Sequence, residues 1–127
     1  GYNYSADQRF RVVSDKAIPE GDHIFSFEFT PTGKADRARG KGVPANIRLL
    51  VDGKTIGSGD LPVTIPLSIG IAAGVSVGAD AGSPVMEEGD YAAPFPFTGT
   101  VKRALVDVSG ELVEDKEAQM RMYLARQ

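Results

Sequence analysis

The sequence predicts an all-β protein, specifically a jelly-roll-like antiparallel β-sandwich with one C-terminal α-helix. The 127 residues include 15 Gly and 8 Pro at 42% hydrophobic content, a composition typical of turn-rich β-proteins. Several short segments alternate apolar and polar residues, as strands do when one face lies on a core. A chain of this length can bury one core, so residues 1–127 are expected to form a single domain.

The first strong strand signal is the phenylalanine-rich segment HIFSFEFT, residues 23–30. Phe25, Phe27 and Phe29 occupy every second position, so their rings are expected to lie on one face and to pack into the core. Upstream of this segment, the sequence predicts a short strand over Arg9–Val13 and a turn over Ala17–Asp22 that is set by Pro19 and Gly21.

A β-hairpin is predicted in the middle of the chain. Asn46–Asp52 places Ile47, Leu49 and Val51 at alternate positions, which is typical of a strand. Asp52 and Gly53 both tolerate positive φ, so a tight type I′ turn should fold Lys54–Gly57 back onto that strand.

Further strands and a helix are predicted in the second half. Leu67–Gly78 is apolar at every odd position and is expected to form two strands with a break near Ala73 and Gly74. Thr100–Val108 is expected to be the last strand. Glu111–Gln127 lacks Gly and Pro, with acids early and Arg late, so a terminal helix is predicted there.

The connection over residues 78–97, GADAGSPVMEEGDYAAPFPF, has no helical or strand period. Connections of this length are uncommon in compact domains and usually bind, dock or remain disordered. Tyr91, Phe95 and Phe97 argue against disorder because aromatic rings bury large areas. Pro94 and Pro96 restrict the backbone to extended geometry. We therefore expect the three rings to anchor the loop on an apolar surface.

Composition narrows the function classes. The net charge is −3 and the pI is about 5.1, so no positive field is expected to attract nucleic acid. The absence of Cys removes thiolate metal sites and cysteine nucleophiles and leaves the compartment, cytoplasmic or periplasmic, undecided. Neither a transmembrane run of about eighteen apolar residues nor a signal peptide is expected, so no membrane partner is predicted.

The order of several segments resembles the C-terminal domain of a group of long bacterial arylsulfatases, which belong to the type I sulfatase family. The resemblance spans nearly the whole chain and includes the opening YNY and the charged end. Its most specific part is Tyr91–Gly99. The segments that carry it are GKGVPANIRLLVDGKTIGSG, VSVGADAGSPV and YAAPFPFTGTVKRALVDVSGE.

The resemblance implies a noncatalytic sandwich domain that packs in cis on a sulfatase catalytic domain and helps to frame its substrate entrance. In this family a formylglycine, made within a Cys/Ser-x-Pro-x-Arg motif, and a calcium ion both belong to that other domain. This chain lacks the motif. Ser83 is followed directly by Pro84, with Glu87 in place of Arg, and Ser5 has Asp7 where Pro is required. No cofactor is therefore expected here, and the chain alone should show no sulfatase, esterase or glycosidase activity.

Other chemistry in the sequence has competing interpretations. Glu87, Glu88 and Asp90 are either paired glycosidase carboxylates or solvated loop acids. Together with Asp80 they are also a possible oxygen-ligand set for calcium, although the spacing matches no EF-hand. His23 is the single histidine, so a Ser-His-Asp triad would need to form around the edge of a strand.

Two ligand surfaces remain candidates. Lys34, Arg37, Arg39 and Lys41 form a basic, Gly-punctuated loop that suits an anionic sulfated group or acidic partner residues. Asp80, Ser83, Tyr91, Phe95 and Phe97 form the candidate interface or ligand loop. An alternative function is a carbohydrate-binding, lectin-like module in which these aromatic rings stack on a sugar. Solvent-exposed rings would favour that alternative, and inward-facing rings would favour the accessory domain.

Overall fold

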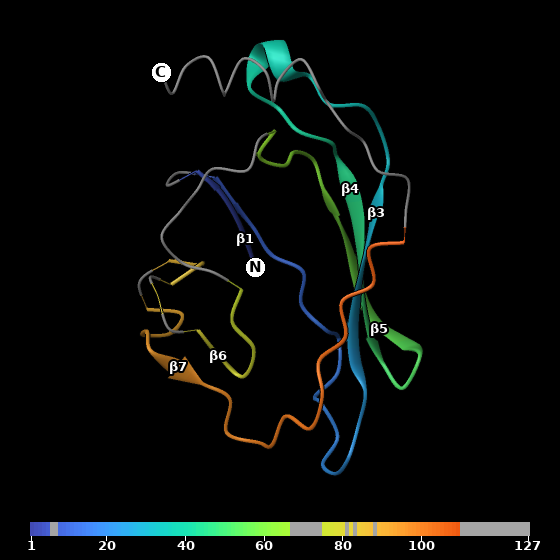
Figure 1. Cartoon of the computed structure of the whole chain (residues 1–127), viewed down its shortest axis with the longest axis vertical. Helices are drawn as coiled ribbons and strands as arrows, with labels where there is room; N and C mark the ends of the chain where they lie inside the picture. Colours follow the sequence, from blue (N-terminus) through green and yellow to red (C-terminus); the bar gives the residue numbers. More distant parts are fainter. Residues whose placement is uncertain (6–7, 67–74, 81, 83, 88, 110–127) are drawn as a thin grey trace.

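The computed structural model of the chain describes residues 1–5, 8–66, 75–80, 82, 84–87 and 89–109 (Figure 1). These residues form seven strands in three antiparallel sheets and one short 3-10 helix, η1 (Arg37–Arg39). The predicted all-β class is confirmed. The jelly-roll sandwich stays a prediction. The expected terminal helix Glu111–Gln127 and residues 67–74 of the expected strands lie outside the described residues. The strand expected over residues 75–78 is wrong, because the chain is irregular there.

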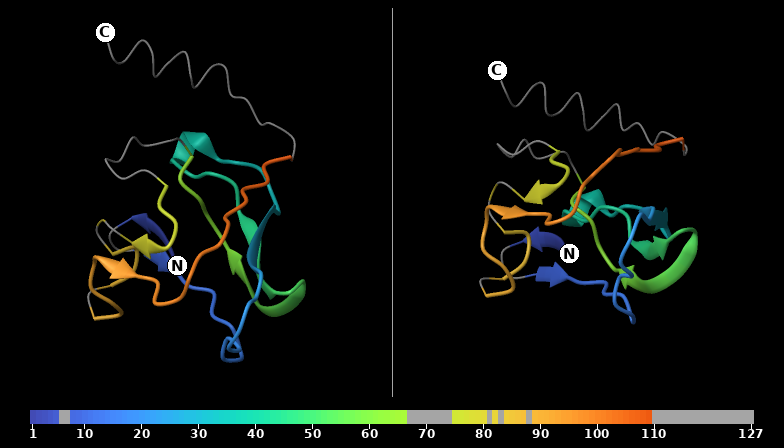
Figure 2. Two further views of the ribbon diagram at one scale, coloured as in Figure 1. Left: turned by 60° about the horizontal axis from the view of Figure 1, so that its bottom comes forward. Right: turned by 90° about the horizontal axis from the view of Figure 1, so that it is seen from below.

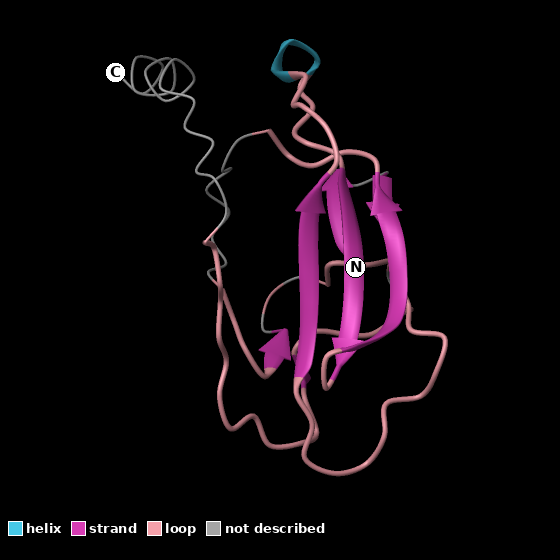
Figure 3. Ribbon diagram, turned by 90° about the vertical axis from the view of Figure 1, so that its right-hand side faces the viewer, coloured by secondary structure: helices cyan, strands magenta, loops and turns pink. Residues whose placement is uncertain are grey.

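The largest sheet has the order β3-β4-β5 and forms a single layer (Figure 3). Its strands are β3 (Phe25–Pro31), β4 (Ala45–Val51) and β5 (Lys54–Leu61). Asp52 and Gly53 connect β4 to β5 with φ of 49° and 76°, the positive values that a type I′ turn needs. The hairpin and the strand over the phenylalanine-rich segment are therefore confirmed. A shift in register after Leu49 places a bulge in the β4–β5 ladder.

The amino-terminal residues form a second sheet, in which β1 (Tyr2–Ser5) pairs with β2 (Gln8–Phe10). The strand expected over Arg9–Val13 therefore begins and ends earlier than predicted. After β2, the chain crosses β5, where the Asp15 N–H donates to the Ile56 carbonyl at 2.9 Å. Gly57 and Gly59 permit this crossing because a Cβ at either position would lie within 3 Å of residues 12–13.

The third sheet closes the long connection. β6 (Ala79–Asp80) pairs with β7 (Phe95–Pro96), and the Phe97 N–H adds a bond to the Gly78 carbonyl at 2.8 Å. The connection predicted to lack secondary structure therefore has a short ladder at its base. In both views of Figure 2, this pair lies beside the β1–β2 pair, on the side away from the β3-β4-β5 sheet.

The prediction of a strand over Thr100–Val108 is wrong. This segment is irregular and exposed, and its described backbone groups join no ladder. Alternating apolar residues favour a strand only when a neighbouring edge accepts their hydrogen bonds. Lys102 connects the segment to the rest of the molecule through an ion pair with Asp22, with 2.5 Å between Nζ and Oδ2.

The core among the described residues is small and lies on the β4–β5 side of the central sheet. The phenylalanines of β3 are not part of it, contrary to expectation: Phe25, Phe27 and Phe29 are 49%, 71% and 42% exposed. Alternation does place them on one face, but the amino-terminal segment crosses β5 and leaves β3 less covered. The buried hydrophobic side chains are those of Ala45, Leu50, Val51, Leu61 and Val63.

Candidate functional site

Three of the predicted site residues meet at the base of the long connection. The Tyr91 hydroxyl donates to the Asp80 carboxylate at 2.5 Å and accepts the Val85 N–H at 2.8 Å. The Tyr91 ring contacts Phe95 with centroids 5.1 Å apart, and Phe95 pairs with Asp80 across the β6–β7 ladder. The bond to Asp80 raises the pKa of Tyr91 above its usual value. This cluster holds the loop closed and offers no activated nucleophile.

The rings of Phe95 and Phe97 are less buried than predicted. Phe95 and Phe97 are 54% and 53% exposed, so the expected apolar surface beneath them covers only part of each ring. Phe97 instead lies close to its own chain, because a Cβ on Gly99 would be 2.7 Å from the Phe97 ring. The exposed parts of both rings remain accessible to a ligand or partner.

Ion pairs, which the sequence analysis did not anticipate, attach the acidic part of the loop to the amino-terminal sheet. Arg11 pairs with Asp90, and the Arg9 Nη1 lies 3.7 Å from the Glu87 Oε1. Glu87 and Asp90 thus each form an ion pair with an arginine. The unpaired carboxylates of a glycosidase pair or of a calcium site would be arranged differently. Within the described ranges, no group of three or more acidic or histidine side chains could hold a metal ion. Ser83 and Glu88 lie outside those ranges.

The segment around η1, which carries the basic residues, lies at the end of the molecule distant from β6 and β7 (Figure 1). Arg37 and Arg39 belong to η1, which begins after Asp36. The Asp36 carboxylate accepts the Arg39 N–H at 3.3 Å and pairs with the Arg39 guanidinium at 3.5 Å. Lys34 is exposed just upstream. The structure therefore does not bring Lys34, Arg37 and Arg39 together with the loop residues.

His23 lies beside the hairpin turn. Its Nδ1 is 2.7 Å from the Asp52 Oδ2, and its Nε2 is 3.1 Å from the Glu20 carbonyl. The bond to Asp52 and, secondarily, the bond to Glu20 raise the pKa of His23, whereas the Ile24 N–H and then His23 lower the pKa of Asp52. With both ring nitrogens occupied by these partners, the histidine braces the turn.

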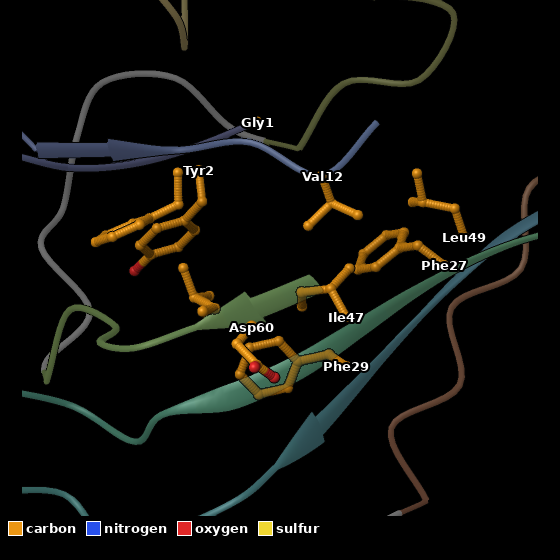
Figure 4. A pocket seen from close by; sticks show the side chains of 10 residues that line it. Gly1, Tyr2, Val12, Phe27, Phe29, Ile47, Leu49 and Asp60 are labelled. Carbon is orange, nitrogen blue, oxygen red and sulfur yellow. The ribbon is translucent and has the colours of Figure 1, made fainter. Parts of the chain in front are cut away.

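A pocket that the sequence analysis missed lies between the amino-terminal segment and the central sheet (Figure 4). Its volume is about 510 Å³. The alternation in β3 and β4 did indicate a shared apolar face, but nothing in the sequence showed that Tyr2 would pair with Phe10 beside it. The residues that line it include Tyr2, Val12, Phe27, Ile47, Leu49 and Asp60.

Comparison of the chain with protein-family models, curated proteins and solved structures found no match. No helix within the described ranges has the length and apolar character needed to cross a bilayer.

Proposed function

We propose that this chain is a noncatalytic accessory domain that packs on a sulfatase-type catalytic domain of the same polypeptide. The observation that carries the proposal is the open apolar face of β3. Phe25, Phe27 and Phe29 project from a complete antiparallel ladder with β4, yet a large part of each ring is exposed. A contiguous row of exposed aromatic residues is typical of an interface, since monomeric proteins rarely leave such patches in water.

The exposed segment after β7 also supports a docking function. Leu105, Val106 and Val108 are among the most exposed large hydrophobic residues of the described chain. The backbone of this segment joins no ladder in the described part of the molecule, so its N–H and C=O groups are available to a neighbouring sheet edge. A partner that covers it would bury apolar side chains and pair the backbone at the same time.

The proposal assigns the chemistry to the partner domain. Formylglycine and calcium would belong there, as the family resemblance implies, and this chain would supply packing and help to frame the substrate entrance. The basic surface around η1 suits a position near that entrance, because Lys34 and Arg39 are exposed cations that attract a sulfated, anionic substrate.

The test starts from the natural coding sequence around this chain, which should encode a domain with a Cys/Ser-x-Pro-x-Arg motif. That domain and this chain, produced separately, should form a one-to-one complex in sedimentation experiments. Phe25→Ser should weaken the complex by at least about tenfold, because exposed aromatic residues at an interface often act as hot spots.

Glu28→Gln is the matched control. Glu28 lies on the opposite face of β3, where it pairs with Arg48, so its replacement should leave the complex intact. A natural polypeptide without any sulfatase-type domain would refute the proposal. So would equal binding by both variants, since the β3 face would then play no part.

A second candidate function is carbohydrate binding, which the exposure of Phe95 and Phe97 favours. Two half-exposed rings separated by one residue can stack on a sugar ring, and the adjacent Asp80–Tyr91 bond holds the loop in shape. A glycan-array screen followed by Phe95→Ala and Phe97→Ala tests it. Loss of glycan binding at unchanged stability would favour the lectin-like module over the accessory domain.

A further inference from the structure

β3 is an edge strand of the central sheet, and its backbone pairs with β4 on one side only. Two bonds, both of 2.9 Å, show which of its residues face β4. The Asp52 N–H donates to the Ile24 carbonyl at one end of the ladder, and the Thr32 N–H donates to the Pro44 carbonyl at the other. Because bonded pairs alternate along an antiparallel ladder, the even-numbered residues of β3 face β4. The N–H and C=O groups of its three phenylalanines therefore point to the free edge.

Pro31 fits this arrangement. Proline has no N–H to give to a ladder, so within sheets it is confined to positions where that group would face away from the neighbouring strand. Pro31 lies opposite Ala45 at the end of β3, in phase with the phenylalanines, so the β3–β4 ladder loses no bond there. The position of this proline supports the same assignment of the outward-facing groups, independently of the hydrogen bonds.

The described part of the chain leaves this edge unpaired. No backbone group among the described residues bonds to the outward-facing groups of the three phenylalanines. The segment of residues 100–108 is tied to the start of β3 by the Lys102–Asp22 ion pair, yet it joins no ladder. Natural proteins usually blunt such an edge with charges, bulges or a very short strand. β3 has seven residues, pairs with β4 without a register shift and presents aromatic residues, so its edge is suited to accept another strand.

We propose that the free edge of β3 binds one extended strand of a partner protein through backbone hydrogen bonds. An antiparallel strand would place an apolar side chain opposite each phenylalanine, because directly opposite residues of paired strands share a face. On the other face it would carry uncharged or basic side chains, since an acid opposite Glu28 would be repelled. The inference rests on the docking proposal for the identity of the partner: the element of the catalytic domain that meets this chain is then a strand.

The probe is an acetylated and amidated octapeptide in which three valines alternate with three threonines between two terminal lysines. NMR titration of the isolated chain should shift the amide signals of Phe25, Phe27 and Phe29. The valines would face the phenylalanines, so their N–H groups would bond to β3, whereas the threonine N–H groups would point away. N-methylation of the central valine should therefore weaken binding at least about fivefold, and N-methylation of the preceding threonine should change it less than about twofold.

Phe27→Pro and Phe27→Ala form the matched pair of protein variants. Both remove the ring, and only the proline also removes the outward-facing N–H. Because that N–H does not face β4, the ladder to β4 should persist, as it does at Pro31. Phe27→Pro should bind the octapeptide at least about fivefold more weakly than Phe27→Ala does. If Phe27→Pro does not fold, the two methylated peptides still decide.

Several results would overturn the proposal. These are failure of the octapeptide to bind, equal weakening by the two N-methyl groups, or equal binding by the two Phe27 variants. Sedimentation of the chain alone as a dimer that Phe27→Pro dissociates would also overturn it, because the occupant of the edge would then be a second copy of this chain. The docking proposal fails separately, since it is tested through Phe25→Ser and the catalytic domain without any peptide.

Discussion

Asp52 combines three local roles at one position. It occupies the left-handed region with φ of 49°, where Asp is tolerated better than most residues, and its two carboxylate oxygens bind separate groups. Oδ1 accepts the Ile24 N–H at 3.0 Å, while Oδ2 faces His23. The Asp52 N–H also donates to the Ile24 carbonyl at 2.9 Å. The residue therefore ties the start of β3 to the turn between β4 and β5.

The His23–Asp52 pair predicts a specific pH dependence. The pKa of His23 is raised, so the stability it contributes is complete below its ordinary pKa of about 6.5 and is lost as the pH rises through the folded value. The pKa of Asp52 is lowered, so its contribution is lost only when the pH falls through that folded value. The pair therefore stabilises the fold most between the ordinary pKa values of the two groups, about 3.8 for Asp52 and about 6.5 for His23.

NMR titration of the His23 ring should give a pKa above 6.5 in the folded chain. Asp52→Asn should return it toward the ordinary value, because the carboxylate is gone while Asn still tolerates positive φ and still accepts the Ile24 N–H. An unchanged His23 pKa in this variant would show that the Glu20 carbonyl, and not Asp52, dominates the shift.

The exposure of Phe27 changes the stability expected of its variants. A buried aromatic residue would cost about 3–5 kcal/mol when truncated, which is what alternation alone predicts. At 71% exposure, Phe27→Ala should cost no more than about 1 kcal/mol, similar to Glu28→Ala on the opposite face. Leu50→Ala, at a position only 7% exposed, should cost about 2–5 kcal/mol. Denaturant midpoints measure all three, and a Phe27→Ala loss equal to that of Leu50→Ala would show that a buried face had been missed.

At the level of elements, β5 is the strand against which the amino-terminal segment packs. Gly57 and Gly59 face that segment, and a Cβ on Gly57 would lie 2.8 Å from the Val13 carbonyl oxygen and 3.1 Å from the Ser14 Cα. These are backbone atoms, which cannot rotate away as a side-chain end could. The small residues of this strand therefore reflect the close approach of another chain segment.

Gly57→Ala should disrupt this contact while the hairpin remains. We expect a loss of about 1–3 kcal/mol, the usual range when a tightly packed site is overfilled. Hydrogen exchange should show faster exchange at the Asp15 N–H, which bonds to Ile56 beside the crossing. Ser58→Ala, an exposed neighbour, should change stability by less than about 0.5 kcal/mol. Unchanged protection of Asp15 in Gly57→Ala would mean that the segment does not cross there.

The elements that could be predicted are those specified by nearby residues. The β4–β5 hairpin depends on Asp52-Gly53 and on the alternation beside it, so both strands and the turn were found. β6 and β7 were missed because each has only two residues and pairs with a partner 15 or more positions away in sequence. The false strand over residues 100–108 has the right pattern but no neighbouring edge in the described structure.

For the molecule as a whole, the arrangement of sheets depends on contacts that leave no sequence pattern. The sequence singled out Asp80, Tyr91 and Phe95 as residues of one loop, and the structure does bring them together. The sequence could not show that Arg9 and Arg11 would meet the acids of that loop. An ion pair between residues 79 positions apart, such as Arg11 and Asp90, leaves no periodic pattern or characteristic spacing in the sequence. The pocket could not be predicted from the sequence for the same reason, since its two walls come from segments that are distant in the sequence.

The attachment of the long loop to the amino-terminal sheet should therefore depend on salt. Arg11 and Asp90 are 47% and 34% exposed in their side chains, so their coupling should fall in the range of partly solvated pairs, about 0.2–1 kcal/mol. A double-mutant cycle with Arg11→Ala, Asp90→Ala and the double variant isolates that coupling from other effects of each truncation. Near 1 M salt the Debye length falls to about 3 Å, so the coupling should shrink markedly there. Lys102 and Asp22, a more exposed pair, serve as the reference and should show a smaller coupling at every salt concentration. If the Arg11–Asp90 coupling were zero at low salt, the aromatic contacts around Tyr91 would have to hold the loop without help from charge.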